Sequence, residues 1–317
     1  MSGMQITDWL LDADPSLRWQ VMQDLLDEPE DVFRVERARV AREGHGAELL
    51  SLQDDRGYWN NDEYGEDGCR RSVMWTLALL RRLGVDPRDP AVVRAVGKVR
   101  DNVTWHYWDD LPYFHGEVEP CINGGVLAQG AYFGVVGEGS ERILARLYDE
   151  QLDDGGWNCE APESKRSSFD TTLCVVEGLL EYECAAGTGA ERAAEARRRG
   201  EEYLLERSLF RWLSTGEVAE GRYLNFSFPS YWFYDVLRAL DHFRSVGGPV
   251  DPRLGPALEE LVSRRGDDGR WAAGIAWPGE TYLDVDAPEG EPSHWNTLRA
   301  LRVLRWADVD GSRSESA

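Results

Sequence analysis

The segment QLDDGGWNCE, from Gln151 to Glu160, places two acids, two glycines and a tryptophan directly after a polar, helix-like run. Similar segments occur twice more, as LQDDRGYWNN at residues 52–61 and as RGDDGRWAAG at residues 265–274. Glycine tolerates the left-handed backbone that ends a helix, and acidic side chains accept hydrogen bonds from N–H groups in turns. We therefore expect three equivalent turns, each held by an indole that packs between neighbouring units.

The segments between these turns have helical periodicity and form two alternating sets. Segments such as 91–103, 140–152 and 193–207 carry one charged face and are expected to be outer helices. The strongly apolar segments are expected to be inner helices, and they span residues 16–26, 70–84, 121–137, 169–182, 230–243 and 294–306. No segment shows the period-two alternation of a sheet. The sequence thus predicts an all-α fold, an α/α toroid of about six concentric helical hairpins.

The apolar segments share signals for the start of a helix. Proline suits the first helical turn, where its missing N–H group costs nothing. The prolines that precede apolar segments are Pro15, Pro120, Pro229 and Pro292. The expected N-caps near such starts are Asp14, Ser168 and Ser293.

Composition limits the partners and the location of the protein. The chain of 317 residues has a net charge of −23, which disfavours binding to nucleic acid or to an anionic membrane. We expect no secretory signal, and the sequence has no apolar run long enough to span a membrane. The five cysteines are odd in number and fit a reducing compartment, so we expect a cytoplasmic protein. We expect one toroid domain over residues 1–307 and a disordered tail over residues 308–317.

The repeated turn carries a family resemblance. The stretch QLDDGGW resembles the Q-x-x-D-G-x-W repeat of squalene–hopene cyclases and their relatives. That superfamily includes the terpene cyclases and the β-subunits of protein prenyltransferases. The resemblance covers roughly residues 8–307, and it implies an α/α toroid whose inner helices line a substrate cavity. One toroid can host cyclisation, prenyl transfer or no catalysis, so the resemblance indicates the fold more strongly than the function.

One motif points to a metal. Asp67, Gly68 and Cys69 resemble the zinc motif of the prenyltransferase β-subunits, in which an Asp and a Cys join a His from another inner helix. Such ligands suit a tetrahedral Zn²⁺ with one open position. The resemblance implies zinc bound by Asp67 and Cys69 with His115 or His294, although the start of the next inner helix lacks the family's His. A diphosphate substrate would bring Mg²⁺ instead, and a merely structural Cys69 is the alternative.

A second motif lies at residues 167–173. The stretch SSFDTTL resembles the end of the D-x-D-D-T-A motif of protonating cyclases, with Asp170 and Thr171 at its final Asp-Thr. Phe169 replaces the aspartate that donates the proton in that family. The resemblance therefore implies that Asp170 orients a substrate group or a water molecule, with help from Thr171. The alternative is that Asp170 caps its helix.

Further candidates lie before the last apolar segment. Asp284 and Asp286 belong to an acidic loop between Ala272 and Pro292, and loops of that length often form lids or binding loops. We include both as candidate catalytic residues, together with His294 at the following helix start. A solvated acidic loop is the alternative interpretation.

Aromatic residues are concentrated beside the expected inner-helix starts, at residues 104–114 and 226–234. Aromatic rings line apolar cavities, and their faces stabilise carbocations. The candidate substrate-binding residues are Trp108, Asn123, Thr171, Tyr231, Trp232, Trp295 and Asn296.

These features favour an enzyme similar to prenyltransferases and terpene cyclases, acting on an apolar isoprenoid or polycyclic substrate in a central aromatic cavity. The alternative is a catalytically silent toroid that binds a hydrophobic ligand or a protein partner. Polar residues at the helix starts favour the enzyme, whereas the missing middle aspartate favours the alternative.

Overall fold

The computed structural model describes residues 3–65, 68–187 and 189–309. Within these residues helices dominate, and the sheets are two antiparallel pairs of two-residue strands, β1 (Thr104–Trp105) with β2 (Leu111–Pro112) and β3 (Trp271–Ala272) with β4 (Pro292–Ser293). The prediction of a helical fold is therefore confirmed. Residues 310–317 of the expected tail lie outside the described residues.

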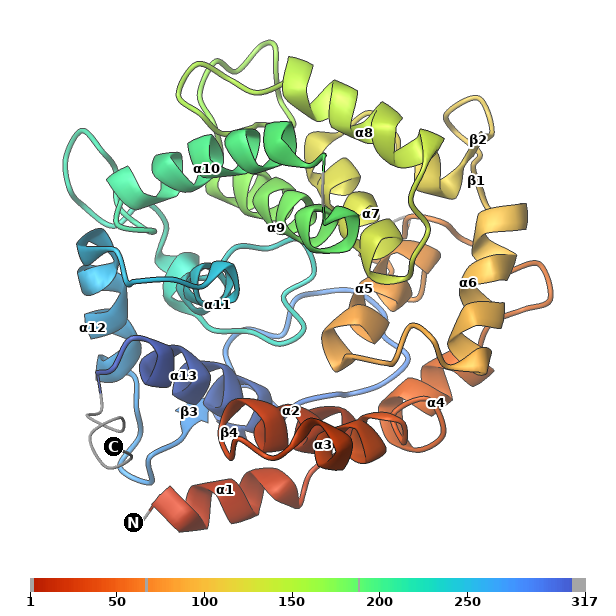
Figure 1. Cartoon of the computed structure of the whole chain (residues 1–317). Helices are drawn as coiled ribbons and strands as arrows, with labels where there is room; N and C mark the ends of the chain where they lie inside the picture. The colour runs from red at the N-terminus through yellow and green to blue at the C-terminus, as the bar shows by residue number, and fades with distance from the viewer. Residues whose placement is uncertain (1–2, 66–67, 188, 310–317) are drawn as a thin grey trace.

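The helices form two layers around the middle of the molecule (Figure 1). The inner layer consists of α2 (Pro15–Asp24), α5 (Val73–Leu83), α7 (Pro120–Tyr132), α9 (Phe169–Ala186), α11 (Val236–Val246) and α13 (His294–Trp306). The outer layer consists of α4 (Gly44–Ser51), α6 (Pro90–Asn102), α8 (Glu138–Asp149), α10 (Glu191–Glu206) and α12 (Gly255–Ser263). Two further helices, α1 (Gly3–Leu11) and α3 (Glu30–Arg37), lie beside α2 on the outside.

Burial explains the difference between the layers. In α9 every residue from Phe169 to Val176 is buried, because this helix has neighbours on all sides. The outer helix α10 keeps a charged face exposed, for example at Glu191 and Arg198. Two glycines let the inner helices α7 and α9 approach closely, since a Cβ atom on Gly178 would lie 2.2 Å from the carbonyl oxygen of Gly124.

The three tryptophans of the repeated turn, Trp59, Trp157 and Trp271, occupy equivalent positions, as predicted. Each is fully buried, between an outer helix and the next inner helix. Each indole N–H donates a hydrogen bond to the carbonyl of the leucine ten residues earlier, Leu49, Leu147 or Leu261, at 2.8, 2.7 and 2.8 Å. The turn is thereby fixed against the outer helix that precedes it, which sets where the next inner helix starts.

The residue six positions before each of these tryptophans closes the turn. Gln53 donates to the carbonyls of Gly57 and of Ala95 in α6, and Gln151 donates to those of Gly155 and of Ala196 in α10. In the third copy Arg265 donates to the carbonyl of Gly269. In the first two copies the glutamine therefore also connects one hairpin to the next.

The predicted start signals are confirmed at four helices. The side chains of Asp14, Ser168 and Ser293 cap α2, α9 and α13, and Pro15 and Pro120 occupy the first turns of α2 and α7. The expected helix over residues 230–243 begins only at Val236, where Asp235 supplies the cap. Residues 230–235 form an irregular segment instead, in which Tyr231 has a φ of +48°. Pro229 accordingly precedes non-helical residues, whereas Pro292 lies two residues before the start of α13, as predicted.

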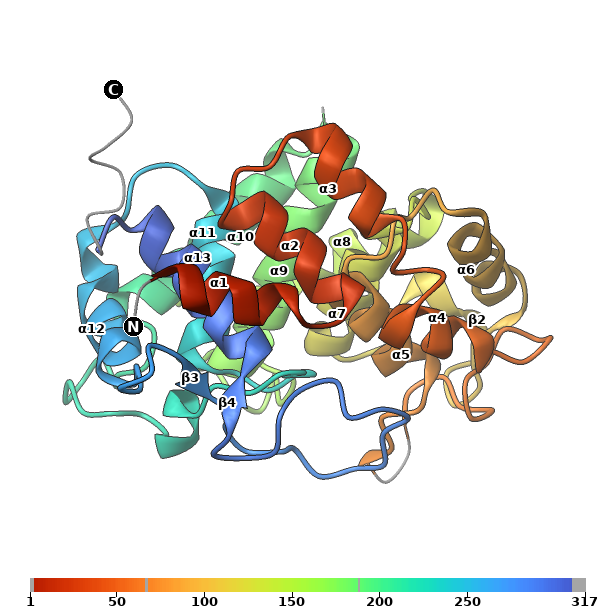
Figure 2. The same ribbon diagram turned by 90° about the horizontal axis from the view of Figure 1, so that it is seen from below.

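The long segment between β3 and β4 crosses one face of the molecule (Figure 2). It reaches the chain just before α5, where the N–H of Arg70 donates to the carbonyl of Glu280 at 2.8 Å and Arg71 donates to the carbonyl of Thr281 at 3.0 Å. Among the described residues, no helix has the length and apolar character needed to cross a membrane.

Candidate functional site

A central cavity of about 420 Å³ lies among the inner helices α5, α7, α9 and α11. Its volume falls in the range of roughly 300–1,000 Å³ that is usual for small-molecule sites. The apolar part of the wall consists of Met74, Trp75 and Ala78 on α5, Ile122 and Ala128 on α7, and Trp232 before α11. Polar residues at the starts of α7 and α9 also face this space, namely Glu119, Cys121, Ser168, Asp170 and Thr171.

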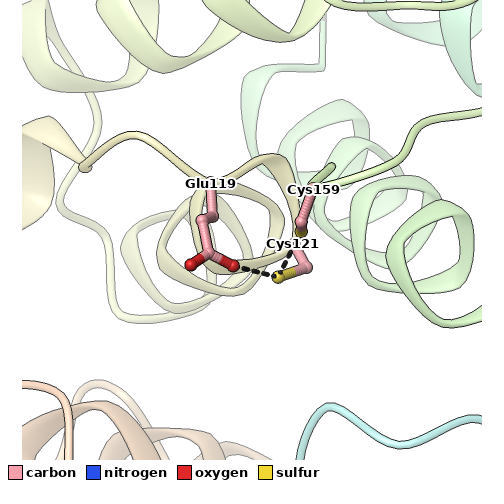
Figure 3. Close-up of side chains that lie close together, drawn as sticks. All are labelled: Glu119, Cys121 and Cys159. Carbon is pink, nitrogen blue, oxygen red and sulfur yellow. Dashed lines mark hydrogen bonds between the residues drawn. The ribbon is translucent and has the colours of Figure 1, made fainter. Parts of the chain in front are cut away.

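A thiol–carboxylate cluster of Glu119, Cys121 and Cys159 lies in the wall of this cavity (Figure 3). The two sulfur atoms lie 2.9 Å apart, and the Cys121 sulfur lies 3.6 Å from Oε2 of Glu119. Glu119 and Cys121 flank the proline that starts α7, whereas Cys159 follows the second tryptophan turn. Segments almost forty residues apart in the chain thus bring three potential metal ligands together.

Hydrogen bonds surround this cluster. The thiol of Cys159 lies 3.4 Å from the hydroxyl of Thr171, which in turn accepts a hydrogen bond from the hydroxyl of Ser168 at 2.9 Å. The proton of Thr171 is therefore available to the Cys159 sulfur. The hydrogen bond shared between the two thiols, together with burial, raises the pKa of the Cys121 thiol well above its ordinary value. Without a cation Cys121 is thus a protonated thiol near neutral pH.

Asp170 also lines the cavity, but its carboxylate is fully engaged. Arg222 donates to both oxygens, at 3.0 and 2.7 Å, and the backbone N–H of Tyr234 donates to Oδ1 at 2.8 Å. The hydroxyl of Tyr223 adds a fourth, longer bond at 3.3 Å. The alternative that Asp170 caps α9 is wrong, because Ser168 is the cap. Asp170 instead ties the start of α9 to the segment over residues 222–234.

The floor of the cavity is an ion-pair network. Glu177 accepts two hydrogen bonds from Arg238, at 2.8 and 2.7 Å, and a longer one from Arg82 at 3.5 Å. Burial alone would raise the pKa of Glu177, but attraction by Arg238 and then Arg82 outweighs it, and the pKa lies well below its ordinary value. Glu177 is therefore an anion near neutral pH and has no proton to donate as a general acid.

Beneath this floor lies a second cavity of about 320 Å³. Arg81, Arg82, Glu177 and Arg238 line both cavities and form the partition between them. The remaining wall comes mainly from the second halves of inner helices and includes Glu181, Asp241, His242, Arg299 and Arg302. Burial lowers the pKa of Arg82 to about 9, against the opposing attraction of Glu177.

Aromatic rings and an arginine form the rim of the central cavity. The guanidinium of Arg70 lies 4.7 Å from the ring centroid of Tyr231 and 5.1 Å from that of Trp75. These are cation–π distances. Burial raises the pKa of Tyr231 to about 12, so the phenol stays neutral.

The predicted substrate-binding residues fall into three groups. Thr171, Tyr231 and Trp232 line the central cavity, as does Asp170. Trp295 lines the second cavity, where it stacks on Phe228. The last group, Trp108, Asn123 and Asn296, lines neither of these cavities.

Each member of the last group has a different setting. Trp108 lies in the β1–β2 hairpin and is 36% exposed. Asn123 is buried, where it accepts from the N–H of Glu117 and donates to its carbonyl. Asn296 is also buried and donates to the carbonyls of Phe226 and Ala272. The two asparagine side chains form hydrogen bonds with buried backbone groups. Their presence near helix starts is therefore explained by the stability of the fold.

The predicted catalytic residues other than Asp170 lie outside both cavities. Asp284 is exposed, and Asp286 accepts a hydrogen bond from the Ser293 hydroxyl. Burial raises the pKa of Asp286 above its ordinary value. His294 stacks on Trp9 with 3.8 Å between ring centroids, and burial lowers its pKa. His294 lies at the start of α13 and the two aspartates lie in the loop before it, and none of the three lines either cavity.

The zinc set implied by the resemblance fits the described residues poorly. Asp67 lies outside them. Cys69 lines an outer cavity with His106, whereas His115 lies against Gly139 at the start of α8. Among the described residues, one group of three potential ligands stands within mutual reach, and it is Glu119, Cys121 and Cys159. Sequence reasoning missed it, although a Glu-Pro-Cys helix start and a cysteine beside the repeated turn were both visible.

Comparison with known proteins identifies the fold only. No protein-family model matches the chain, and no curated protein matches it by sequence. The structure is similar to that of a polysaccharide lyase, with a TM-score of 0.53 and 12% identity over the whole of both chains. A protein from Actinoplanes has a TM-score of 0.47 and 19% identity, covering 96% of this chain and 98% of its own. A type II terpene cyclase from Scytonema, with geranylgeranyl dihydroxybenzoate as substrate, has a TM-score of 0.41 and 14% identity, covering 95% of this chain and 85% of its own. At these identities the likeness to the lyase concerns the fold alone, and the two lower scores support no further conclusion.

Proposed function

We propose that the protein is an enzyme that acts on an apolar isoprenoid or polycyclic substrate inside the central cavity. The fold in this proposal is a single α/α toroid over residues 1–307, similar to that of the terpene cyclases and prenyltransferases. The observation that carries the proposal is the cavity itself, in which apolar and aromatic walls surround a small set of reactive groups. The repeated tryptophan turn supports the same family.

The walls favour an apolar substrate over a sugar. A saccharide needs many hydrogen-bond partners, but the carboxylates of Asp170 and Glu177 are already engaged by Arg222 and Arg238. A hydrocarbon chain needs no such partners and gains from contact with Trp75 and Trp232. Cleavage of a polysaccharide is therefore not the activity that we propose.

Binding of prenyl alcohols of increasing length, measured by calorimetry, tests the proposal. Ala78 lines the cavity, so Ala78→Phe should fill part of it and abolish binding of the longest alcohol. Ala185→Phe is the matched control, because Ala185 is exposed near the end of α9. Absence of saturable binding to the wild-type protein, or equal losses in the two variants, would refute the proposed site.

A silent toroid that only binds its ligand is the second candidate. It is favoured by Asp170, whose carboxylate has no free position for a substrate or a transferable proton. Incubation with prenyl diphosphates, followed by mass spectrometry of the extracted products, separates the two candidates. A cyclised or transferred product supports the enzyme, whereas tight binding without turnover supports the silent toroid.

A further inference from the structure

The cluster of Glu119, Cys121 and Cys159 has the composition and the setting of a metal site. We propose that these three side chains bind one Zn²⁺ ion, with a fourth coordination position that opens into the central cavity. Two thiolates and one carboxylate are ligands that Zn²⁺ accepts, and the sulfur atoms select against Mg²⁺ and Ca²⁺. Three protein ligands with one open position is the arrangement of catalytic zinc sites, whereas structural sites have four protein ligands.

The distances allow this coordination with a small adjustment. The three ligand atoms lie within 4.8 Å of one another. The sulfur atoms, now 2.9 Å apart, need to separate by about 0.9 Å to stand at tetrahedral angles around zinc with Zn–S bonds of about 2.3 Å. Rotation about the Cα–Cβ bonds supplies such a movement without any change in the backbone.

The backbone already presents the ligands. Cys121 lies in the first turn of α7, where the helix dipole stabilises a thiolate. Glu119 occupies the N-cap position of the same helix, yet its side chain makes no capping hydrogen bond and remains available to a cation. Cys159 lies two residues after Trp157, whose indole is fixed to the carbonyl of Leu147. All three ligands therefore project from anchored positions.

An outer shell of hydrogen bonds is also present. Thr171 lies 3.4 Å from the sulfur of Cys159, and its own oxygen accepts from Ser168. The Thr171 hydroxyl can thus donate to a zinc-bound thiolate, which is the role of outer-shell partners in zinc proteins. Thr171 would thus act as a positioning residue, because it orients the sulfur of Cys159 and does not contact the metal itself.

The open position faces the space proposed for the substrate. Glu119, Cys121 and Cys159 all line the central cavity, together with Tyr64 and Asn158. A water molecule, or an oxygen or sulfur atom of a cavity ligand, completes the coordination. The site is independent of which organic substrate the protein uses, so its test employs the metal alone.

The test is titration of the reduced full-length protein with Co²⁺ and Zn²⁺. We expect one equivalent of Co²⁺ to produce thiolate charge-transfer absorption and the visible bands of tetrahedral cobalt, and one equivalent of Zn²⁺ to displace it. Cys121→Ser and Cys159→Ser should each lose the charge-transfer intensity of one sulfur. They should also weaken Zn²⁺ binding by at least the ~10–100-fold that loss of an outer-shell partner costs. Circular dichroism establishes that each variant is folded.

Three further variants make the result specific. Glu119→Gln should weaken Zn²⁺ binding while retaining the sulfur charge-transfer bands, because both thiolates remain. Cys69→Ser and Cys184→Ser are the controls, since Cys69 lines the outer cavity and Cys184 is exposed on α9. Both should bind Co²⁺ like the wild-type protein.

Three outcomes would overturn the proposal. One is the absence of thiolate–cobalt bands in the reduced wild-type protein. Another is loss of those bands in Cys69→Ser, which would show that the metal binds at Cys69, in the site implied by the sequence resemblance. The third is a Cys121–Cys159 disulfide that persists under reducing conditions, because both sulfur ligands would then be consumed. None of these outcomes decides whether the cavity binds a prenyl chain, so the two proposals fail independently.

Discussion

The two cavities share α5, α9 and α11 in their walls, and they differ in how their polar groups are paired. Around the second cavity the acids are matched to arginines, as in the pairs of Asp241 with Arg302 and of Glu181 with Arg81. At the wall of the central cavity, the side chains of Glu119 and the two cysteines form hydrogen bonds, within the described residues, only with one another and with Thr171. Polar groups that are buried and fully paired stabilise a fold, whereas groups left available can bind a ligand.

The partition between the cavities separates the wall whose polar groups are paired from the wall whose polar groups are available. Arg238 and Glu177 are buried at the centre, where an unpaired charge would be costly. Their mutual pairing closes the floor of the central cavity and leaves the space above it for another molecule. The predictions below test this division, beginning with the partition and ending at the thiol–carboxylate cluster.

The largest effect is expected at Glu177. Glu177→Gln removes the charged partner of Arg238 and leaves a buried guanidinium uncompensated, so the free energy of unfolding should fall by about 3–5 kcal/mol. Urea denaturation monitored by circular dichroism measures the change. Glu181→Gln, one turn further along α9 and more exposed, is the control and should cost less than about 1 kcal/mol. Equal costs in the two variants would contradict the special role of the partition.

Acid should weaken the same network. The pKa of Glu177 and that of Asp241 are both lowered, because attraction by arginines outweighs the effect of burial. A carboxyl group with a lowered pKa in the folded state stabilises the protein above its unfolded pKa, and this contribution disappears as the pH falls further. The free energy of unfolding should therefore decline below about pH 4.5, by on the order of 2 kcal/mol for each such group. Urea denaturation at several pH values should show a shallower decline for Glu177→Gln, and identical declines would argue against this origin.

A smaller effect on the free energy of unfolding is expected at Asp170. This residue lines the central cavity, but it is paired with an arginine like the acids around the second cavity. Asp170→Asn keeps an oxygen for the N–H of Tyr234 but weakens both bonds from Arg222, so it should cost about 1–2 kcal/mol. The double variant with Arg222→Gln measures the coupling, because removal of the arginine should make the asparagine nearly neutral. Additive costs in this cycle would show that the pairing contributes nothing.

The smallest effect on stability is expected at Cys159, which is half-buried in the cavity wall. Cys159→Ala should change the free energy of unfolding by no more than about 0.5 kcal/mol in the absence of metal, since surface-type positions tolerate substitution. Added Zn²⁺ should raise the melting temperature of the wild-type protein and leave that of the variant unchanged, because a ligand of the folded state stabilises it by mass action. Calorimetry with and without Zn²⁺ measures both changes, and a large cost without metal would assign the thiol to the core instead.

The helical fold could be predicted because its signals are local. The tryptophan turns, the capping residues Ser168 and Ser293 and the alternation of apolar with charged segments all lie within a few residues of the structure they specify. The segment from Ser230 to Asp235 was the exception. Its composition suits a helix, but contacts with distant residues hold it in an irregular form, such as the hydrogen bond from Tyr234 to Asp170.

The candidate site was less predictable, because the direction of a side chain depends on the packing of its whole helix. Thr171, Tyr231 and Trp232, which lie near the expected starts of inner helices, do line the central cavity. His294 occupies a similar position along its chain but stacks on Trp9, which comes from the far end of the sequence. A sequence pattern that spans a few residues cannot predict this contact between residues far apart in the chain.

The sequence by itself determined the helices, their two classes and the three tryptophan turns, because hydrophobic periodicity and turn chemistry act over short distances along the chain. Only the tertiary structure decided which polar residues would meet. Glu119 and Cys121 come from one hairpin and Cys159 from the next, and Glu177 finds Arg238 from another helix. Such meetings are set by helix rotation and by the spacing between helices, which long-range packing fixes.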